Sequence, residues 1–397
     1  MKKYLQTHPW LTFKIDLKRA SAELWLLLGE ASSKCEHLAN VPLRPTTAEK
    51  LHQLYLAKGV AATTAIEGNT LSEAEVLQAV EGTLKVPPSK AYLKQEIDNI
   101  IEACNLIGTQ IAAGKLPAIT PALLCEYDRM VLNKLPLEEG VRAGEFREHS
   151  VVVGTVYRGA PAIDCPYLAE HLCEWLNGPD FKVQDKGPAG RELVFAIVKA
   201  VVAHLYFAWI HPFGDGNGRT ARLLEFHILL SAGVPSPAAH LLSNHYNQTR
   251  TEYYRQLEFA SKSGGDIMPF LMYAVRGLVD GLRSQLEYVW DQQWDVVWLN
   301  YVHILFQHKT SPSDVRQRNL ALDLGARRDW VPIADIAELT PRMAKAYAGK
   351  TPKTIQRDLN VLKKFELIAR EDRKVRARRE IIQSFLPLRH KPDPQAK

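Results

Sequence analysis

The stretch from His211 to Arg222 combines a histidine, an acid, three glycines and two arginines within twelve residues. Glycine at 214, 216 and 218 makes a turn with almost no side-chain bulk, so backbone N–H groups can approach an anion closely. Residues 219–226 have a helical pattern, so the turn leads into a helix N-terminus, whose free N–H groups and dipole favour phosphate. The sequence therefore predicts a phosphate-binding loop.

The charged side chains of this stretch extend the prediction. Arg219 and Arg222 are three residues apart, so they are expected to project from one helix face toward the same anion. Asp215 is an acid beside a phosphate site, which is the position of a magnesium ligand. His211 follows an apolar helix and can act as a general base. A Walker A loop is excluded because no Gly-Lys-Ser/Thr follows, and a Rossmann loop because no strand precedes.

The stretch resembles the signature of Fic proteins, His-Pro-Phe-x-(Asp/Glu)-Gly-Asn-Gly-Arg-x-x-Arg, at every fixed position. The resemblance implies transfer of AMP from ATP to a Ser, Thr or Tyr hydroxyl of a target protein or of the chain itself. It assigns His211 as the base, Phe213 as the anchor of the loop in the core and Asp215 as the Mg²⁺ ligand. Glycine rather than lysine after Asn217 favours AMP transfer over the kinase-like branch of the family.

The same resemblance implies the contacts with ATP. The segment Arg250–Leu257 resembles the family segment beside the adenine, although tyrosines at helical spacing are also common in cores. The implied nucleotide-binding residues are Gly216, Asn217 and Gly218 in an anion hole, Arg219 at the β-phosphate, Arg222 at the γ-phosphate and Tyr254 at the adenine.

A second motif precedes the loop. Thr63 to Gly68 contains Ser/Thr-x-x-x-Glu-Gly, which resembles the inhibitory motif of the family class with an N-terminal inhibitory helix. The resemblance implies that Glu67 pairs with Arg222, occupies the γ-phosphate position and holds the enzyme off. A plain surface glutamate before a helix-ending glycine is the alternative. In some relatives this glutamate also orients water that removes AMP, and the sequence leaves that activity open.

One strand signal lies between the two motifs. Residues 151–157 are β-branched and broken by Gly154, which predicts a hairpin. The hairpin at 151–162 resembles the family's flap, whose free edge would bind a target segment by strand addition. An ordinary surface hairpin is the alternative.

The C-terminal part has a different charge and pattern. Residues 351–397 carry thirteen Lys or Arg and six Asp or Glu, a net charge of +7, whereas the whole chain is +6. Short helices at 330–339 and 351–362, the second with Ile355, Leu359 and Leu362 on one face, precede two expected strands at 367–370 and 379–382. This order resembles a winged helix-turn-helix domain.

Two functions are open for such a domain. Residues 351–382 would bind DNA through Lys353, Gln356 and Arg357, with Arg373 and Lys374 at phosphates, or would contact a protein. DNA binding leads to the alternative function of a transcriptional regulator that senses nucleotide. The intact His211 argues against that reading, because sensing ATP needs no base.

We therefore expect a mainly α protein, a Fic helical core with a small β-hairpin flap and a C-terminal winged-helix domain. The expected domains are 1–110 with the inhibitory motif, 111–290 for catalysis and 291–397 for the winged helix. The five cysteines form no Cys-x-x-Cys pair, no export signal is visible, and the apolar run 193–210 is interrupted by Lys199 and His204. A cytoplasmic protein without a membrane span is expected, and the sequence leaves a homodimer open.

Overall fold

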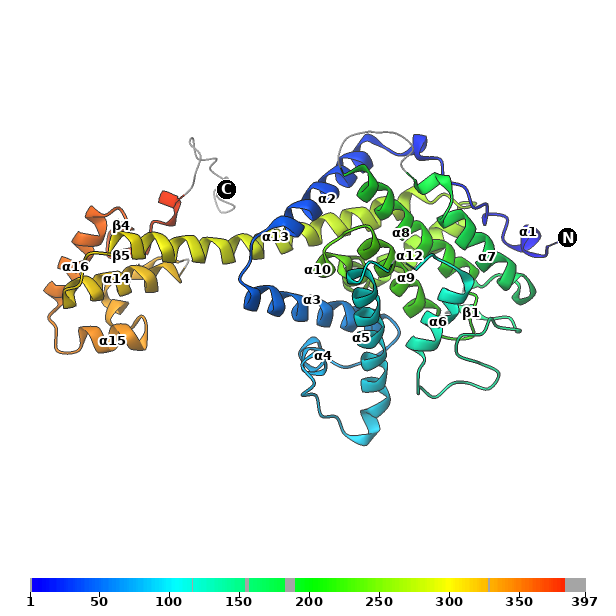
Figure 1. Ribbon diagram of the computed structural model, residues 1–397, viewed down its shortest axis with the longest axis horizontal. Helices are drawn as coiled ribbons and strands as arrows, with labels where there is room; N and C mark the ends of the chain where they lie inside the picture. The colour runs from blue at the N-terminus through cyan, green and yellow to red at the C-terminus, as the bar shows by residue number, and fades with distance from the viewer. Residues whose placement is uncertain (1, 116, 154–156, 183–189, 328, 383–397) are drawn as a thin grey trace. The chain divides into compact units, whose positions relative to one another are not determined.

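The computed structural model describes residues 2–115, 117–153, 157–182, 190–327 and 329–382. The chain folds as two compact units, Met1–Leu286 and Glu287–Lys397. Helices make up most of both units, so the prediction of a mainly α fold is confirmed (Figure 1).

Two antiparallel helices form the centre of the first unit. α8 (Arg191–Ile210) is apolar on nearly all sides, the pattern of a core helix. Of the helices described, α8 alone has the length and apolarity of a membrane span, but 67% of its apolar window is buried inside the protein. α9 (Asn217–Ser231) packs closely along α8, and the short connection between them carries the predicted loop.

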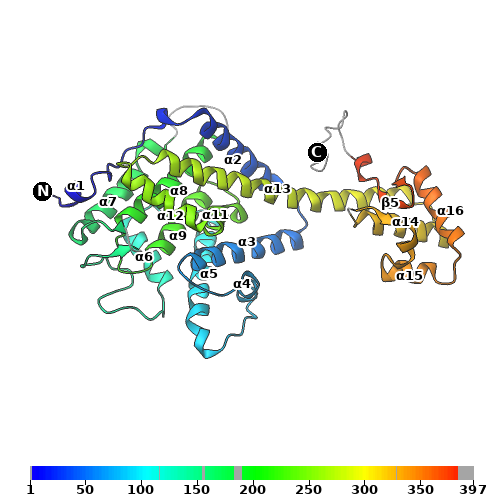
Figure 2. The same cartoon turned by 180° about the vertical axis from the view of Figure 1, so that it is seen from behind.

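The N-terminal helices pack on this pair. α3 (Pro45–Ile66) starts with proline in its first turn and ends before Gly68, whose φ of +102° is the left-handed conformation that terminates helices. α4 (Glu73–Val80) begins with a capping box of Ser72 and Glu75. α4 contacts both α3 and α5, and lies beside them in both views (Figures 1 and 2).

α5 (Ala91–Ala112) crosses the predicted domain boundary between residues 110 and 111. It packs on α3, on α9 and on α6 (Pro121–Val131). Because one continuous helix carries these contacts, residues 1–110 and 111–286 form a single compact unit rather than two.

Further elements complete the first unit. The predicted hairpin is present as antiparallel strands β1 (Val152–Val153) and β2 (Tyr157–Arg158), while Gly154 lies outside the described residues. The other helices are α1 (Tyr4–Thr7), α2 (Ala22–Asn40), α7 (Cys165–Leu176), α10 (Ser236–Ala239), α11 (Leu241–Gln248), α12 (Arg250–Lys262), the first part of α13 (Met268–Leu305) and short 3₁₀ turns at Leu17–Arg19, Pro88–Lys90, Ala162–Asp164 and Pro179–Phe181.

The second unit packs helices on a small antiparallel sheet, with strand order β3-β5-β4. On α16, Leu359 and Leu362 are buried and Ile355 is partly buried, as the apolar face predicts. The elements are α14 (Pro312–Gly325), β3 (Val331–Pro332), a 3₁₀ helix (Ile333–Glu338), α15 (Pro341–Tyr347), α16 (Pro352–Lys364), β4 (Ile368–Glu371), β5 (Lys374–Ala377) and a last 3₁₀ turn (Arg379–Ile382).

Two sequence predictions in this unit were wrong in position. The second strand of the C-terminal hairpin lies at Lys374–Ala377, not at 379–382, because a tight turn at Asp372, with φ of +46°, follows β4 directly. The helix expected at 330–339 starts only at Ile333, because Val331 and Pro332 pair with β5. The winged-helix assignment itself stays a prediction.

Candidate active site

The loop between α8 and α9 is held by its own side chains. Asn217 Oδ1 accepts a hydrogen bond from the Phe213 N–H at 2.9 Å, and Asn217 Nδ2 donates to the Phe213 carbonyl at 2.8 Å. The Phe213 ring is fully buried and stacks on Phe146 with ring centroids 5.4 Å apart. Gly216 has a φ of +75°, and a Cβ there would lie 2.7 Å from Asp128 Oδ1. The side chain of Asn217 thus shapes the loop, and any contact of Asn217 with an anion falls to its backbone N–H.

His211 sits at the C-terminal end of α8 in a left-handed conformation, with φ of 51° and ψ of 60°. Arg147, buried to 4% exposure, fixes the backbone here. Its Nε donates to the His211 carbonyl at 2.7 Å, and its backbone N–H donates to the Pro212 carbonyl at 3.0 Å. Nη1 of the same arginine donates to the His149 carbonyl at 2.7 Å. Sequence reasoning missed Arg147, because nothing in its neighbourhood marks it as part of the site.

The imidazole of His211 is neutral at neutral pH. Burial lowers its pKa to about 4, a bond to the Ala208 carbonyl opposes this shift, and the nearby Arg147 guanidinium lowers the pKa further. A neutral imidazole is the form that accepts a proton.

A cavity of about 440 Å³ lies beside this histidine. It brings together residues predicted from three separate parts of the sequence, since the inhibitory motif, the loop and the segment after α11 all reach it. Neither Asp215 nor Arg219 lines it. The residues that line the cavity include Glu67, Tyr157, His211, Gly218, Arg222 and Tyr254.

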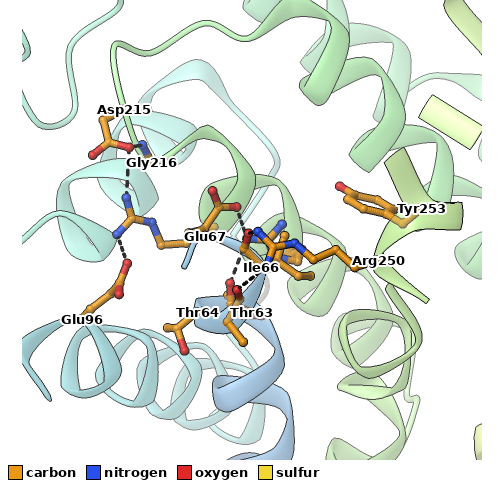
Figure 3. Close-up of polar contacts among 12 residues, drawn as sticks. Thr63, Thr64, Ile66, Glu67, Glu96, Asp215, Gly216, Arg250 and Tyr253 are labelled. Carbon is orange, nitrogen blue, oxygen red and sulfur yellow. Dashed lines mark hydrogen bonds and ion pairs between the residues drawn. The ribbon is translucent and has the colours of Figure 1, made fainter. Parts of the chain in front are cut away.

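The predicted contact of Glu67 with Arg222 is present in the structure. Glu67 Oε1 lies 2.5 Å from Arg222 Nη2, which also donates to the Thr63 carbonyl at 3.0 Å (Figure 3). The Arg222 side chain is 1% exposed and that of Glu67 32%. A Cβ on Gly218 would lie only 2.1 Å from Glu67 Oε1. The carboxylate therefore lies against the N-terminus of α9, where the sequence predicts an anion.

Both members of this pair are charged. Burial alone would raise the pKa of Glu67, but the charge and hydrogen bond of Arg222 outweigh it, so the pKa lies below its usual value. Burial would likewise lower the pKa of Arg222, and Glu67 reverses that effect.

Arg219 has a different environment from Arg222. Its Nη1 lies 2.5 Å from Glu96 Oε1 on α5, and its Nη2 lies 3.1 Å from Asp215 Oδ1 (Figure 3). The spacing predicts that both arginines point toward the same anion. In the structure they do not, because Arg219 pairs with Glu96 and Asp215 whereas Arg222 pairs with Glu67. Sequence reasoning missed Glu96, which lies in an ordinary helical pattern far from the loop.

Asp215 is the candidate metal ligand. Its side chain is 52% exposed, and its Oδ1 accepts hydrogen bonds from the Gly216 N–H and from Arg219. Within the described ranges, no group of three or more His, Cys, Asp or Glu could hold a metal ion. A single accessible carboxylate fits Mg²⁺, which completes its coordination with phosphate and water oxygens. It does not fit an ion that needs several protein ligands.

α12, which follows α11, lines the cavity and supports the end of α3. Tyr254 is 42% exposed and lines the cavity, where the sequence places the adenine contact. Arg250, one turn before it, donates from Nη1 to the Ala65 carbonyl at 3.1 Å and from Nη2 to the Ile66 carbonyl at 2.5 Å. It thereby satisfies free carbonyls at the C-terminal end of α3, directly before Glu67.

The predicted partner surfaces have these positions. Tyr157 of β2 lines the cavity and donates from its hydroxyl to the Trp209 carbonyl at 2.7 Å, so the flap borders the site. Target docking on the flap at 151–162 stays a prediction. In the second unit, contact with DNA also stays a prediction. Of the residues predicted to make it, Gln356 is half-buried, and four are exposed: Lys353, Arg357, Arg373 and Lys374.

Comparison with known proteins bears on these residues. Residues 118–229 match the model of the Fic/DOC family. The matched residues contain the whole loop, Arg147 and all but the last two residues of α9, whereas Glu67, Glu96 and Tyr254 lie outside them.

Related proteins extend the similarity. The chain is 34% identical to the protein adenylyltransferase Fic of Aedes aegypti over 227 residues, 57% of this chain and 40% of that protein. It is 30% identical to the protein adenylyltransferase Fic of Nematostella vectensis over 251 residues, 63% and 53% of the two chains. The chain thus spans about half or less of the length of these relatives.

Solved structures show the same fold. A Fic family protein from Desulfovibrio desulfuricans G20 matches with a TM-score of 0.54 at 20% identity, covering 90% of this chain and 96% of that one. Fic-1 from C. elegans, residues 134–508, matches with a TM-score of 0.54 at 25% identity, covering 67% and 73%.

Proposed function

We propose that this chain transfers AMP from ATP to a Ser, Thr or Tyr hydroxyl of a target protein or of itself. One observation carries the proposal: His211 and Arg222 line the same cavity, at the N-terminus of α9. A proton acceptor and a phosphate-binding cation then meet at one place. The relatives named protein adenylyltransferase support the same chemistry.

The residues suggest how the transfer proceeds. The neutral imidazole of His211 accepts the proton of the target hydroxyl, whose oxygen attacks the α-phosphorus of ATP. The bond from that phosphorus to the bridging oxygen breaks, and pyrophosphate leaves with the electron pair. The free N–H groups at the start of α9 and the guanidinium of Arg222 stabilise the negative charge on the phosphates. This chemistry depends mainly on positioning and charge stabilisation.

Mg²⁺ would be held by Asp215 together with phosphate oxygens. When bound, it neutralises phosphate charge. The chain itself would orient Asp215 through the Gly216 N–H and Arg219, both of which contact its Oδ1.

Glu67 supports a proposal of autoinhibition. Its carboxylate takes the guanidinium of Arg222 and lies against Gly218 at the anion position. A phosphate and this carboxylate would repel each other there, so the Glu67 side chain has to leave before ATP binds with all its phosphates in place. The chain would then be largely inactive until a partner or a conformational change moves the turn that carries Glu67.

The test is incorporation of labelled AMP from ATP into the chain and into lysate proteins. We expect a low signal from the unmutated chain, a signal at least about tenfold higher for Glu67→Ala, and none for Glu67→Ala combined with His211→Ala. Glu49→Ala is the matched control, because Glu49 is an exposed glutamate of α3, the helix that Glu67 follows. Equal signals from the unmutated chain and Glu67→Ala would remove the autoinhibition. Incorporation without His211 would remove the base.

A further inference from the structure

Glu96, the acid that pairs with Arg219, is itself fixed by a hydrogen bond from Asn69. Glu96 Oε1 pairs with Arg219, and Glu96 Oε2 accepts a hydrogen bond from Asn69 Nδ2 at 2.8 Å. Asn69 is fixed in turn, because its Nδ2 also donates to the Leu93 carbonyl at 2.9 Å and its Oδ1 accepts from the Leu71 N–H at 3.0 Å. Both oxygens of the Glu96 carboxylate are thus engaged, and the side chain is only 12% exposed.

Glu96 and Glu67 differ in their backbone location and in the number of hydrogen bonds that their carboxylates accept. Glu67 follows the end of α3 on a turn with Gly68, is 32% exposed, and its carboxylate contacts one side chain, that of Arg222, among the described residues. Glu96 lies inside the long helix α5 and is bonded on both oxygens. A turn residue with one partner can swing away, whereas a helix residue with two fixed partners keeps its place.

Arg219 is left with hydrogen-bonding capacity that the described residues do not use. Its side chain is 6% exposed, yet its Nε has no hydrogen-bond partner among the residues that the structure describes. A buried guanidinium donor without a partner is costly, and it marks a place where a ligand acceptor is missing. Arg219 is also the third residue of α9, so it lies in the first turn, whose backbone N–H groups are free to bind an anion.

We propose that Glu96 is the positioning residue that orients Arg219 toward the polyphosphate of the nucleotide. The inference rests on the proposed function only in that the loop binds ATP. Glu96 fixes one end of the guanidinium, so the remaining donors lie ready for a phosphate oxygen without further loss of side-chain freedom. Asn69 connects this support to the turn that carries Glu67, so one short segment contacts Arg222 directly and is linked to Arg219 through Glu96.

The proposal predicts a dependence on the number of phosphates in the ligand. The affinities of adenosine, AMP, ADP and ATP, each with Mg²⁺, are measured by calorimetry on the full chain carrying Glu67→Ala and His211→Ala. In this background, Arg222 is released from Glu67 and the ligand is not consumed. Glu96→Gln should weaken ADP and ATP by about tenfold and leave adenosine within about twofold. Glu102→Gln, an exposed glutamate of the same helix, should change none of the four.

Three outcomes would overturn the proposal. They are an equal loss for adenosine and ATP, no loss for any ligand, and tighter ATP binding, which would make Glu96 a competitor of the phosphates. In a chain that also carries Arg219→Ala, Glu96→Gln should have no further effect on ATP affinity, because the group that it orients is gone. A further loss of similar size would count against the proposal.

The test is designed so that neither misfolding of a variant nor loss of AMP transfer can produce the expected result. If Glu96→Gln fails to fold by circular dichroism, Glu96→Asp replaces it. Aspartate keeps the charge but is shorter, so the same phosphate-dependent loss is expected at smaller size, and a uniform loss contradicts the proposal. Labelled AMP is not read out. If the affinity series is as expected but the chain with Glu67→Ala alone transfers no AMP, Glu96 is supported while the proposed function is removed.

Discussion

The carboxylate of Glu67 lies against the backbone of Gly218 and is bonded to Arg222 at 2.5 Å. Because position 218 is glycine, nothing separates the carboxylate from the start of α9, which is where phosphate would bind. Under the proposed function, a phosphate bound there and the observed position of Glu67 would exclude each other. The contacts that keep the turn of Glu67 in place become points at which activity can be changed.

Arg250 is one such contact. It donates to the Ala65 and Ile66 carbonyls at the end of α3, so Arg250→Ala should loosen the turn that follows. We expect AMP incorporation to rise about threefold, less than with Glu67→Ala, because the ion pair with Arg222 remains. Arg255→Ala is the control on the same helix, since its side chain is 71% exposed. An unchanged signal would mean that the Glu67 pair alone holds the turn.

Arg147 should matter for catalysis rather than for nucleotide binding. It holds the His211 and Pro212 carbonyls, and with them the left-handed conformation that presents the imidazole. In the Glu67→Ala background, Arg147→Met should lower the rate of AMP incorporation by at least about tenfold and leave the affinity for ATP within about twofold. It should also lower the free energy of unfolding by about 2 kcal/mol, measured by urea denaturation.

A matched variant decides whether that effect is local. The side chain of Arg142 lies five residues earlier and is 77% exposed, so Arg142→Met should alter neither rate nor stability. A rate loss from Arg147→Met that merely follows the unfolded fraction would contradict the positioning of His211.

Tyr254 is expected to contact the base of the nucleotide. Its ring is 42% exposed and lines the cavity, so a bound base can stack on it. Tyr254→Ala should weaken adenosine and ATP equally, by about fivefold, in the calorimetric series, because neither loses a phosphate contact. Tyr92→Ala serves as the control at a tyrosine that is 55% exposed. A loss confined to ATP would move Tyr254 from the base to the phosphates.

Three buried histidines should make the fold sensitive to acid. Burial lowers the pKa of His204 and His240 to about 3 and that of His227 to about 4, below the ordinary value of 6.5. The unfolded chain therefore takes up protons first, and stability present above about pH 6.5 is lost as the pH falls toward 4. At pH 5 the loss is roughly 2 kcal/mol for each histidine.

Urea denaturation at pH 7.5 and pH 5 measures this loss. His240→Asn cannot titrate, so its difference between the two pH values should be smaller than that of the unmutated chain by roughly 2 kcal/mol. An identical difference in both proteins would show that His240 takes no part.

How much of the structure can be predicted from the sequence differs between parts of the chain. The hairpin at β1 and β2 and the apolar face of α16 follow from local patterns, and the structure has them. The C-terminal strand was misplaced by several residues because a basic run gives no periodic signal, and burial of Val375 and Ala377 fixes its place. The predicted boundary at 110 falls inside α5, which is amphipathic, and the helices that cover its apolar face are brought there by tertiary packing.

The sequence by itself determined the loop, since a close approach to phosphate demands glycine and cations in a fixed local order. The resemblance to the inhibitory motif also paired Glu67 with Arg222, although 155 residues separate them. Only the tertiary structure decided which acid of another helix lies beside Arg219. Helix packing brings Glu96 of α5 to Arg219, Arg250 to the end of α3 and Arg147 to His211. Such contacts join residues far apart in the chain, and no local pattern encodes them.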